Sequence, residues 1–237
     1  MIRVLSIIYR GSLLHKSLQR WSHYKRHDNN WECGACDSRY LVKHIHIYDV
    51  FLHQLHILHI ICTGGVYSVS SSFDIESSQV LLNEVRGGSC GGLAIYRCEK
   101  GSVLNTNISN NSAFFDPATH NPASGGGMCI ELSERIIVEH SNFDHNFAAT
   151  VGGGIKFLKV IMVSLLSSSL KYNRATAGGS LGILTSANVT ILKVTFEDST
   201  AANDGGSIDI EESIGVVIEE SEFARSSSLN GDGSSIS

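Results

Sequence analysis

Apolar and polar residues alternate in short runs from residue 62 onward, and these runs return at regular intervals along the chain. Because alternation with a period of two places successive side chains on opposite faces of an extended segment, each run predicts a short β-strand. The first set of apolar positions comprises Tyr67 and Val69, Ala94 and Tyr96, Met128 and Ile130, Ile155 and Phe157, Leu181 and Ile183, and Ile208 and Ile210. The second set comprises Phe73 and Ile75, Gly101 and Val103, Ile136 and Val138, Val163 and Leu165, Val189 and Ile191, and Val216 and Ile218. We expect both sets to face one core.

A third apolar column ends each repeat and is followed by a polar column. Its members are Val80, Ile108, Phe143, Leu170, Phe196 and Phe223. Three residues after each of them come Asn83, Asn111, Asn146, Asn173, Ser199 and Ser226. Asn tolerates the left-handed backbone of turns, and stacked amides can hydrogen bond to one another along an axis. This spacing predicts a corner at which the Asn side chains are bonded from one repeat to the next.

A Gly-Gly pair begins each repeat and sets its length. The second glycines of the pairs are Gly65, Gly92, Gly126, Gly153, Gly179 and Gly206, and Gly233 belongs to a degenerate last copy. The intervals are 26 or 27 residues, except for one of 34 that contains both prolines of the protein, Pro117 and Pro122. We expect the glycines at a second corner, where a positive φ or a close approach of neighbouring turns excludes a β-carbon.

Such a repeat supplies about three short strands and cannot bury its apolar face alone, so like units must stack. The sequence therefore predicts an all-β fold, a right-handed single-stranded parallel β-helix of about six turns over residues 62–237, incomplete at its C-terminal end. With strands about 4.8 Å apart, six turns would form a rod roughly 29 Å long.

Residues 1–61 have a different character, because they hold eight of the 11 His and only two of the 23 Gly. We expect a basic, irregular or partly helical segment there. The run from Ile45 to Cys62 is apolar but contains Asp49 and four His, so no membrane span is expected in this chain. No secretory signal is visible at the start.

Composition narrows the function classes further. A content of 34 Ser, 23 Gly and 14 Asn with 2 Pro disfavours helical bundles. The formal net charge of -5 gives no basic character of the kind that nucleic-acid binders show.

Two motif pairs resemble a known family. They are Phe143-Asp144-His145-Asn146 with Gly152-Gly153-Gly154-Ile155, and Leu170-Lys171-Tyr172-Asn173 with Gly178-Gly179-Ser180-Leu181. They resemble the Phe-x-x-Asn and Gly-Gly-Ala-(Ile/Leu/Val) repeats of chlamydial polymorphic outer-membrane proteins and related right-handed parallel β-helix proteins. The chain departs from these motifs where Gly or Ser replaces Ala, and where Ser replaces Asn in the last two copies. The resemblance covers about residues 62–237 and implies an extracellular or cell-surface, often adhesive protein without catalytic residues in its motifs.

We therefore expect a non-enzymatic scaffold that binds glycans or surface proteins through its outer faces, without a cofactor. The alternative is a polysaccharide lyase or glycoside hydrolase of β-helix type, which needs carboxylates that converge on one outer face. The predicted stacking places Asp209 in a column with Gly182, Lys156 and Cys129, so no acidic cluster emerges. A third possibility is a partial or mispredicted gene product in which the first 60 residues do not belong to the fold.

Apolar residues also fall at outward positions. Leu158 over Leu184 and Leu166 over Leu192 would form an outer ridge across neighbouring turns, which either binds a partner or is covered by a flanking segment such as residues 41–61. The open C-terminal end of the stack also invites end-to-end association, because exposed end strands favour edge pairing.

The cysteines and sequons add weaker signals. Cys33 and Cys36 have the Cys-x-x-Cys spacing of zinc and redox sites, but no second pair completes a metal site, so thiols or a local disulfide are expected. Cys62 and Cys90 precede adjacent Gly-Gly pairs and are candidates for a disulfide. Of three Asn-x-Ser/Thr sequons, that of Asn188 occupies an outward position and is the best candidate for glycosylation.

Overall fold

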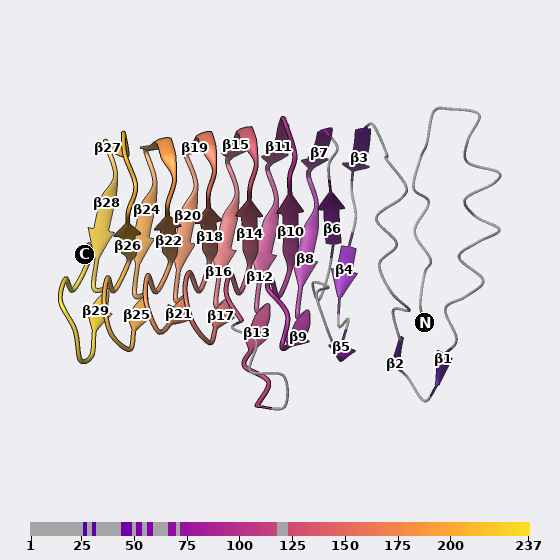
Figure 1. Cartoon of the computed structure of the whole chain (residues 1–237), viewed down its shortest axis with the longest axis horizontal. Helices are drawn as coiled ribbons and strands as arrows, with labels where there is room; N and C mark the ends of the chain where they lie inside the picture. Colours follow the sequence, from indigo (N-terminus) through magenta and orange to yellow (C-terminus); the bar gives the residue numbers. More distant parts are fainter. Residues whose placement is uncertain are drawn as a thin grey trace.

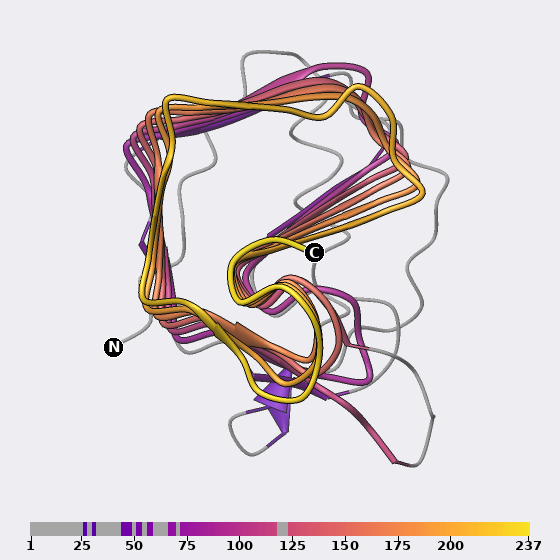
Figure 2. The same cartoon turned by 90° about the vertical axis from the view of Figure 1, so that its left-hand side faces the viewer.

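A computed structural model describes residues 72–117 and 123–237 and, before them, the backbone of six strands. The described chain is a parallel β-solenoid of about six turns, which confirms the predicted fold class. Successive turns superimpose when the molecule is seen end on (Figure 2), and their strands lie side by side when it is seen from the side (Figure 1).

Four parallel sheets run the length of the coil, one strand per turn. Sheet 1 consists of β6 (Val66–Val69), β10 (Leu93–Tyr96), β14 (Met128–Glu131), β18 (Ile155–Leu158), β22 (Leu181–Leu184) and β26 (Ile208–Glu211). Sheet 2 consists of β3 (His44–Tyr48), β7 (Ser72–Glu76), β11 (Gly101–Leu104), β15 (Glu134–Glu139), β19 (Ile161–Leu166), β23 (Ala187–Leu192) and β27 (Val217–Glu219).

The other two sheets have shorter strands. Sheet 3 consists of β4 (Phe51–His53), β8 (Gln79–Leu81), β12 (Asn107–Ser109), β16 (Asn142–Asp144), β20 (Ser169–Lys171), β24 (Thr195–Glu197) and β28 (Glu222–Ala224). Sheet 4 consists of β5 (His56–Leu58), β9 (Glu84–Arg86), β13 (Ser112–Phe114), β17 (Phe147–Ala148), β21 (Arg174–Ala175), β25 (Thr200–Ala201) and β29 (Ser227–Ser228). Turns 1 to 6 are numbered by their first strands, β6, β10, β14, β18, β22 and β26, and each turn includes the glycine segment that precedes its first strand. Each turn has four strands rather than three, because a strand of two or three residues follows the Asn column.

The parallel ladder begins before the predicted boundary at residue 62. Strands β3, β4 and β5 pair in parallel with β7, β8 and β9 and add a partial turn below turn 1. Two further strands, β1 (Arg26–His27) and β2 (Asn30–Trp31), pair antiparallel with each other. The described part of the chain contains no helix, and most of residues 1–61, where a partly helical segment is expected, lie outside the described residues.

The core fills the bore between sheets 1, 2 and 3. The second and third apolar columns face it as predicted, and Phe143, Leu165 and Phe196 are fully buried. The prediction of which residues of the first apolar set face the core was wrong by one residue in turns 1 and 2. Leu93 and Ile95, rather than Ala94 and Tyr96, pair in register with Met128 and Ile130.

The cause of this error is the glycine phase. A β-carbon on Gly91 would meet Gly126 O at 2.3 Å, so Gly91, and not Gly92, is stacked on Gly126. Cys90 occupies the place that Gly125 has in the next turn, and the Gly-Gly pair of turn 2 is therefore shifted by one residue.

The glycines lie where the chain curls inward between sheet 4 and sheet 1 (Figure 2). The first of them, such as Gly152, has a positive φ of 68°. The second is excluded from bearing a side chain by close approach, because a β-carbon on Gly153 would lie 2.3 Å from Gly179 O and 2.6 Å from the backbone of Arg174. In turns 3 to 6 glycine therefore occupies both positions, for different physical reasons. The inward residues of sheet 4 are correspondingly small: Ala113, Ala148, Ala175 and Ala201.

The Asn column forms a buried ladder of hydrogen bonds along the axis. The Asn146 side-chain Oδ1 accepts from Asn111 N at 3.0 Å and from Asn111 Nδ2 at 3.1 Å. Its Nδ2 donates to Ile108 O at 2.8 Å and to Asn173 Oδ1 at 3.1 Å. The left-handed residue at this corner is the one before each Asn, such as His145 with φ 52°. That residue turns its side chain outward, and Asn turns inward.

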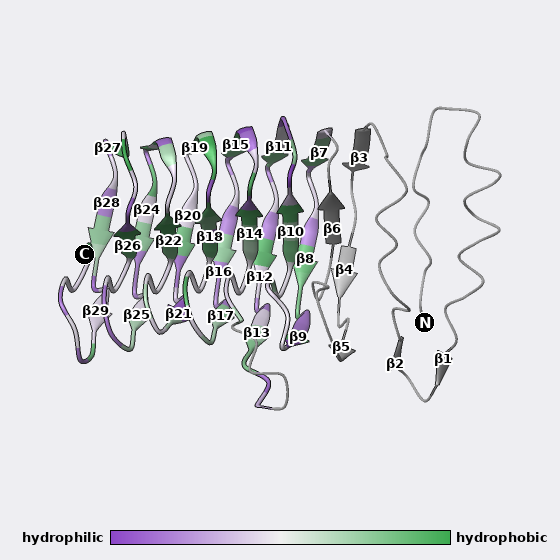
Figure 3. Cartoon of the chain, in the orientation of Figure 1, coloured by the Kyte–Doolittle hydropathy of each residue, from purple (hydrophilic) through white to green (hydrophobic). Residues whose placement is uncertain are grey.

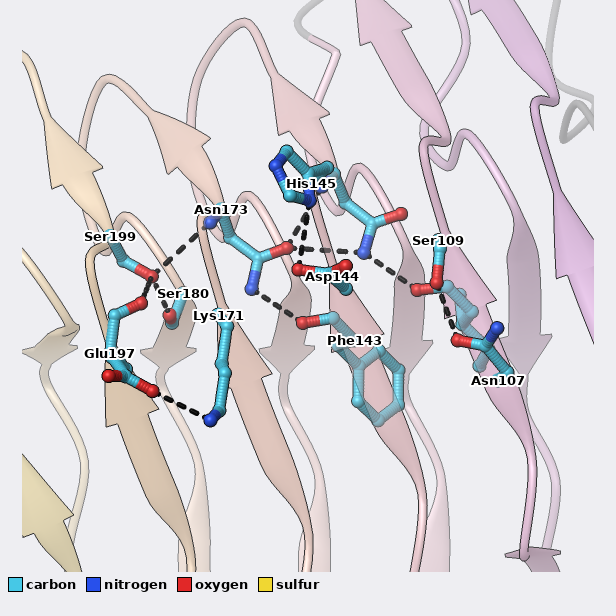
Figure 4. Close-up of polar contacts among 12 residues, drawn as sticks. Asn107, Ser109, Phe143, Asp144, His145, Lys171, Asn173, Ser180, Glu197 and Ser199 are labelled. Atoms are coloured by element: carbon cyan, nitrogen blue, oxygen red, sulfur yellow. Dashed lines mark hydrogen bonds and ion pairs between the residues drawn. The ribbon is translucent and has the colours of Figure 1, made fainter.

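The identity of the third Gly-motif residue depends on this ladder. A β-carbon on Gly154 would lie 2.8 Å from Ser180 O and 3.2 Å from Asn173 Cγ, so the next turn and the Asn side chain together crowd this position. In turn 5 the smaller Ser199 stands in the column, and Ser180 takes the place of the glycine, with 2.6 Å between the two Oγ atoms (Figure 4). The two departures from the repeat motif are thus one coupled change of packing.

Candidate functional site

The corner between sheets 3 and 4 presents charged and aromatic side chains outward over turns 3 to 6. This surface is formed by the last residues of β16, β20 and β24 and by the left-handed residues after them. Figure 4 shows Asp144, His145, Lys171 and Glu197 from this group. We call this group the charged cluster. It consists of Asp144, His145, Lys171, Tyr172, Glu197, Asp198 and Arg225.

Ion pairs within the charged cluster link successive turns. Lys171 Nζ lies 2.6 Å from Glu197 Oε2, which joins turn 4 to turn 5 (Figure 4). The Arg225 guanidinium lies 2.8 Å from Asp198 Oδ1 and also pairs with Glu197, which joins turn 5 to turn 6. These groups are therefore oriented by their neighbours along the axis.

Two aromatic rings form the other half of the cluster. The rings of His145 and Tyr172 are stacked, with centroids 4.8 Å apart and an interplanar angle of 24°. His145 Nδ1 lies 2.9 Å from Asp144 Oδ1. Because Tyr172 remains 47% exposed, this flat pair is accessible to a ligand.

The pKa values of Glu197, Asp198 and Lys171 shift toward the charged forms. A hydrogen bond from Lys171 lowers the pKa of Glu197, and the Arg225 guanidinium lowers the pKa of Asp198. The hydrogen bond to Glu197 raises the pKa of Lys171. The carboxylates of Glu197 and Asp198 therefore stay ionised and the Lys171 amine stays protonated at neutral pH.

Asp209 is the contrasting carboxyl. It is buried on the outer side of β26, and desolvation raises its pKa above the ordinary value. Its Oδ1 accepts a hydrogen bond from Ser237 Oγ at 3.1 Å, whereas Oδ2 is buried without a partner among the described residues. In the part of the chain that the structure describes, no three His, Cys, Asp or Glu residues are grouped to hold a metal ion.

The predicted outer ridge is divided between two corners. Leu158 pairs with Leu184 at the end of sheet 1, and Leu166 pairs with Leu192 at the end of sheet 2. All four side chains are half-buried. The strands within residues 41–61 do not lie over them, because β3, β4 and β5 stack at the N-terminal end of the coil.

The disulfide differs from the predicted one. Cys90 is bonded to Cys129 of the next turn, so it cannot pair with Cys62, which lies outside the described residues. The two cysteines lie on either side of the long 34-residue interval and join turn 2 to turn 3 across it. Spacing from the Gly-Gly pairs missed this bond because the phase of turn 2 is shifted.

The other predicted site residues are Asn188, Cys33, Cys36 and Gly65. Asn188 is exposed in β23 and has a positive φ of 54°. Cys33, Cys36 and Gly65 lie outside the described residues.

Sequence reasoning missed the charged cluster because its members occupy the variable positions of the Phe-x-x-Asn motif and come together only from turns about 27 residues apart. The signal that could have found them is their constant position, one or two residues before the Asn and Ser column.

Comparison with models of known protein families, with curated protein sequences and with solved structures finds no match. The parallel coil is observed, whereas these comparisons give no support to membership of the polymorphic outer-membrane protein family. Among the described residues, no helix has the length and apolar character needed to cross a membrane.

Proposed function

We propose that this protein is a non-enzymatic, extracellular or surface-displayed scaffold that binds carbohydrate through the charged cluster. The proposal keeps the adhesive role implied by the resemblance to polymorphic outer-membrane proteins and assigns it to one corner of the coil. The observation that carries it is the exposed, stacked pair of His145 and Tyr172 beside oriented charges.

This arrangement suits a sugar ring. Aromatic faces and edges receive the apolar C–H groups of a pyranose, while charged groups held in place exchange hydrogen bonds with its hydroxyls. The cluster has three carboxylates, Asp144, Glu197 and Asp198, against two permanent cations, Lys171 and Arg225, so its formal charge is -1 with His145 neutral. We expect neutral glycans to bind better than acidic ones.

The pKa directions favour binding over proton transfer at this site. A general acid for glycoside cleavage needs a carboxyl with a raised pKa, and a lysine base needs a lowered one. Glu197, Asp198 and Lys171 shift in the opposite directions. Asp209 has a raised pKa, but it is buried on another sheet.

The Cys90–Cys129 disulfide supports the proposed location. Disulfides persist in oxidising compartments and are rare in reducing ones. Mass spectrometry of the protein from its native source, with and without reduction, tests this part. Thiols at both positions would contradict a secreted scaffold.

Binding to an array of neutral and acidic oligosaccharides, followed by calorimetry on the best ligand, tests the site. Tyr172→Ala should weaken binding at least about tenfold, whereas Tyr172→Phe should retain most of it because the ring remains. Tyr96→Ala is the control, since this half-buried tyrosine lies on sheet 1 beside Arg97 and outside the charged cluster. Equal affinities for the wild type, Tyr172→Ala and Tyr96→Ala would refute the assignment.

The enzymatic alternative is tested on the same samples. The protein is incubated with neutral and acidic polysaccharides, with and without Ca²⁺, and new reducing ends or unsaturated products are measured. We expect none. Turnover that is lost in Glu197→Gln would replace the scaffold proposal with a lyase or hydrolase.

A further inference from the structure

The corner between sheets 1 and 2 carries two charged side chains, Lys159 and Glu212, that form no ion pair with the described residues. Lys159 in turn 4, Thr185 in turn 5 and Glu212 in turn 6 are the left-handed residues that follow β18, β22 and β26. Within the described residues, neither Lys159 nor Glu212 takes part in an ion pair. They lie two strand spacings apart, about 10 Å along the axis.

Beside these charges lies an apolar hollow. Ile161, Ala187 and Ile214 are in register on turns 4, 5 and 6. The two isoleucines are 42% and 72% exposed, and the small Ala187 between them leaves a groove of about 320 Å³. The groove is lined by Lys159, Val160, Ile161, Thr185, Ser186, Ala187, Glu212 and Ile214.

The apolar surface continues into turn 3, where Leu132 at the same corner and Ile137 on sheet 2 are 40% and 43% exposed. In turn 3 the position of Ile161 is taken by Glu134, and Figure 3 shows β15 partly hydrophilic where β19 is hydrophobic. Met162 and Val217, 46% and 43% exposed, extend the surface along sheet 2. Contiguous exposed apolar residues rimmed by charge are typical of protein interaction sites.

The order of the groups points to one occupant. Along the axis, turn 4 contributes the cation Lys159 and Ile161, and turn 5 contributes Ala187. Turn 6 contributes the anion Glu212 and Ile214. A twofold axis through turn 5 would superimpose turn 4 of one copy on turn 6 of another. It would then pair Lys159 with Glu212 and Ile161 with Ile214 of the other copy, twice over.

We propose that this corner is the interface of an antiparallel, twofold homodimer. The cation and the anion lie at equal distances from turn 5, on opposite sides of it. A second copy of the chain needs this arrangement to form two matching ion pairs, whereas an unrelated partner does not. This proposal is independent of carbohydrate binding, because the charged cluster lies at the corner between sheets 3 and 4.

Sedimentation equilibrium on the full chain, made in a host that leaves Asn188 unglycosylated, tests the interface. The wild type should dimerise. Lys159→Glu and Glu212→Lys should each raise the dissociation constant at least about tenfold, because each places two like-charge pairs in the interface. The double variant Lys159→Glu with Glu212→Lys should restore the wild-type constant, since the pairs are re-formed with reversed signs.

Lys193→Glu is the control, because this exposed lysine lies at the corner between sheets 2 and 3. It should leave the dimer unchanged. Circular dichroism verifies that every variant is folded. A wild-type monomer at about 100 μM, or a double variant that stays as weak as the single ones, would overturn the proposal.

Discussion

Turns 2 to 4 and turns 4 to 6 solve the same stacking problem with different chemistry. In the earlier turns, Asn111, Asn146 and Asn173 bond one turn to the next through buried amides. In the later turns, Ser199 replaces the amide, and only one bond of its hydroxyl links two turns, the one accepted from Asn173 N at 3.3 Å. There the exposed pairs of Lys171 and Arg225 with Glu197 and Asp198 span the turns from outside.

At the corner between sheets 3 and 4, the buried side chains stabilise the stack and the exposed side chains are available for binding. When a buried amide is removed, its hydrogen-bond partners are left unsatisfied because water does not reach them. When an exposed ion pair is removed, water solvates the remaining group at little cost in stability. The inside of the corner therefore determines the stacking. The outside remains adaptable for a ligand.

Among changes at this corner, Asn146→Ala is expected to have the largest effect. It leaves Asn111 N and Ile108 O buried without side-chain partners and should lower the free energy of unfolding by about 3 to 5 kcal/mol. Ser199→Ala should cost only about 1 kcal/mol, because it removes a smaller set of bonds. Urea denaturation of both variants measures this contrast, and equal losses would remove the distinction between the two halves.

The coupling between the corner column and the glycine motif should have the next largest effect. Ser199→Asn forces an amide against Ser180 and should destabilise the protein by about 1 to 3 kcal/mol through overpacking. Adding Ser180→Gly recreates the pair formed by Asn173 and Gly154 and should recover most of the loss. A double-mutant cycle measures the coupling, and additive effects would show that the two departures are unrelated.

Acid should weaken the later turns through the charged cluster. The folded-state pKa values of Glu197 and Asp198 are lowered, so their contribution to stability is present above the ordinary carboxyl pKa of about 4 and disappears as pH falls through the folded-state values. The double variant Glu197→Gln with Asp198→Asn should flatten this slope below about pH 4. Hydrogen exchange at several pH values checks it, and an unchanged slope would contradict the role of the pairs.

Ile214→Ser should have the smallest effect on the stability of the monomer, within about 0.5 kcal/mol, because this side chain is largely exposed. The same change at the fully buried Ile191 should unfold much of the coil. Thermal unfolding of both variants at a concentration below dimer formation compares them. A large loss for Ile214→Ser would mean that the groove belongs to the core of the chain.

The repeats were accessible to sequence reasoning because they are local. The spacing of Val80, Ile108 and Phe143 predicts a strand and a core column, and the Asn three residues after each of them predicts a stacked corner. The same reasoning misplaced Ala94 and Tyr96, since Cys90 shifts the glycine phase of turn 2 by one residue and one residue reverses the face of a strand. It also missed the fourth strand of each turn, which is too short to show a period.

By itself, the sequence determined that this chain stacks. Its period, its apolar columns and its corner residues are repeated along the chain, and repetition specifies a solenoid without long-range information. Only the tertiary structure decided which residues about 27 positions apart become neighbours 4.8 Å apart on the outside, because that depends on the register of every turn. The ion pairs of Glu197, the bond between Cys90 and Cys129, and the twofold order of Lys159 and Glu212 all arise from that register.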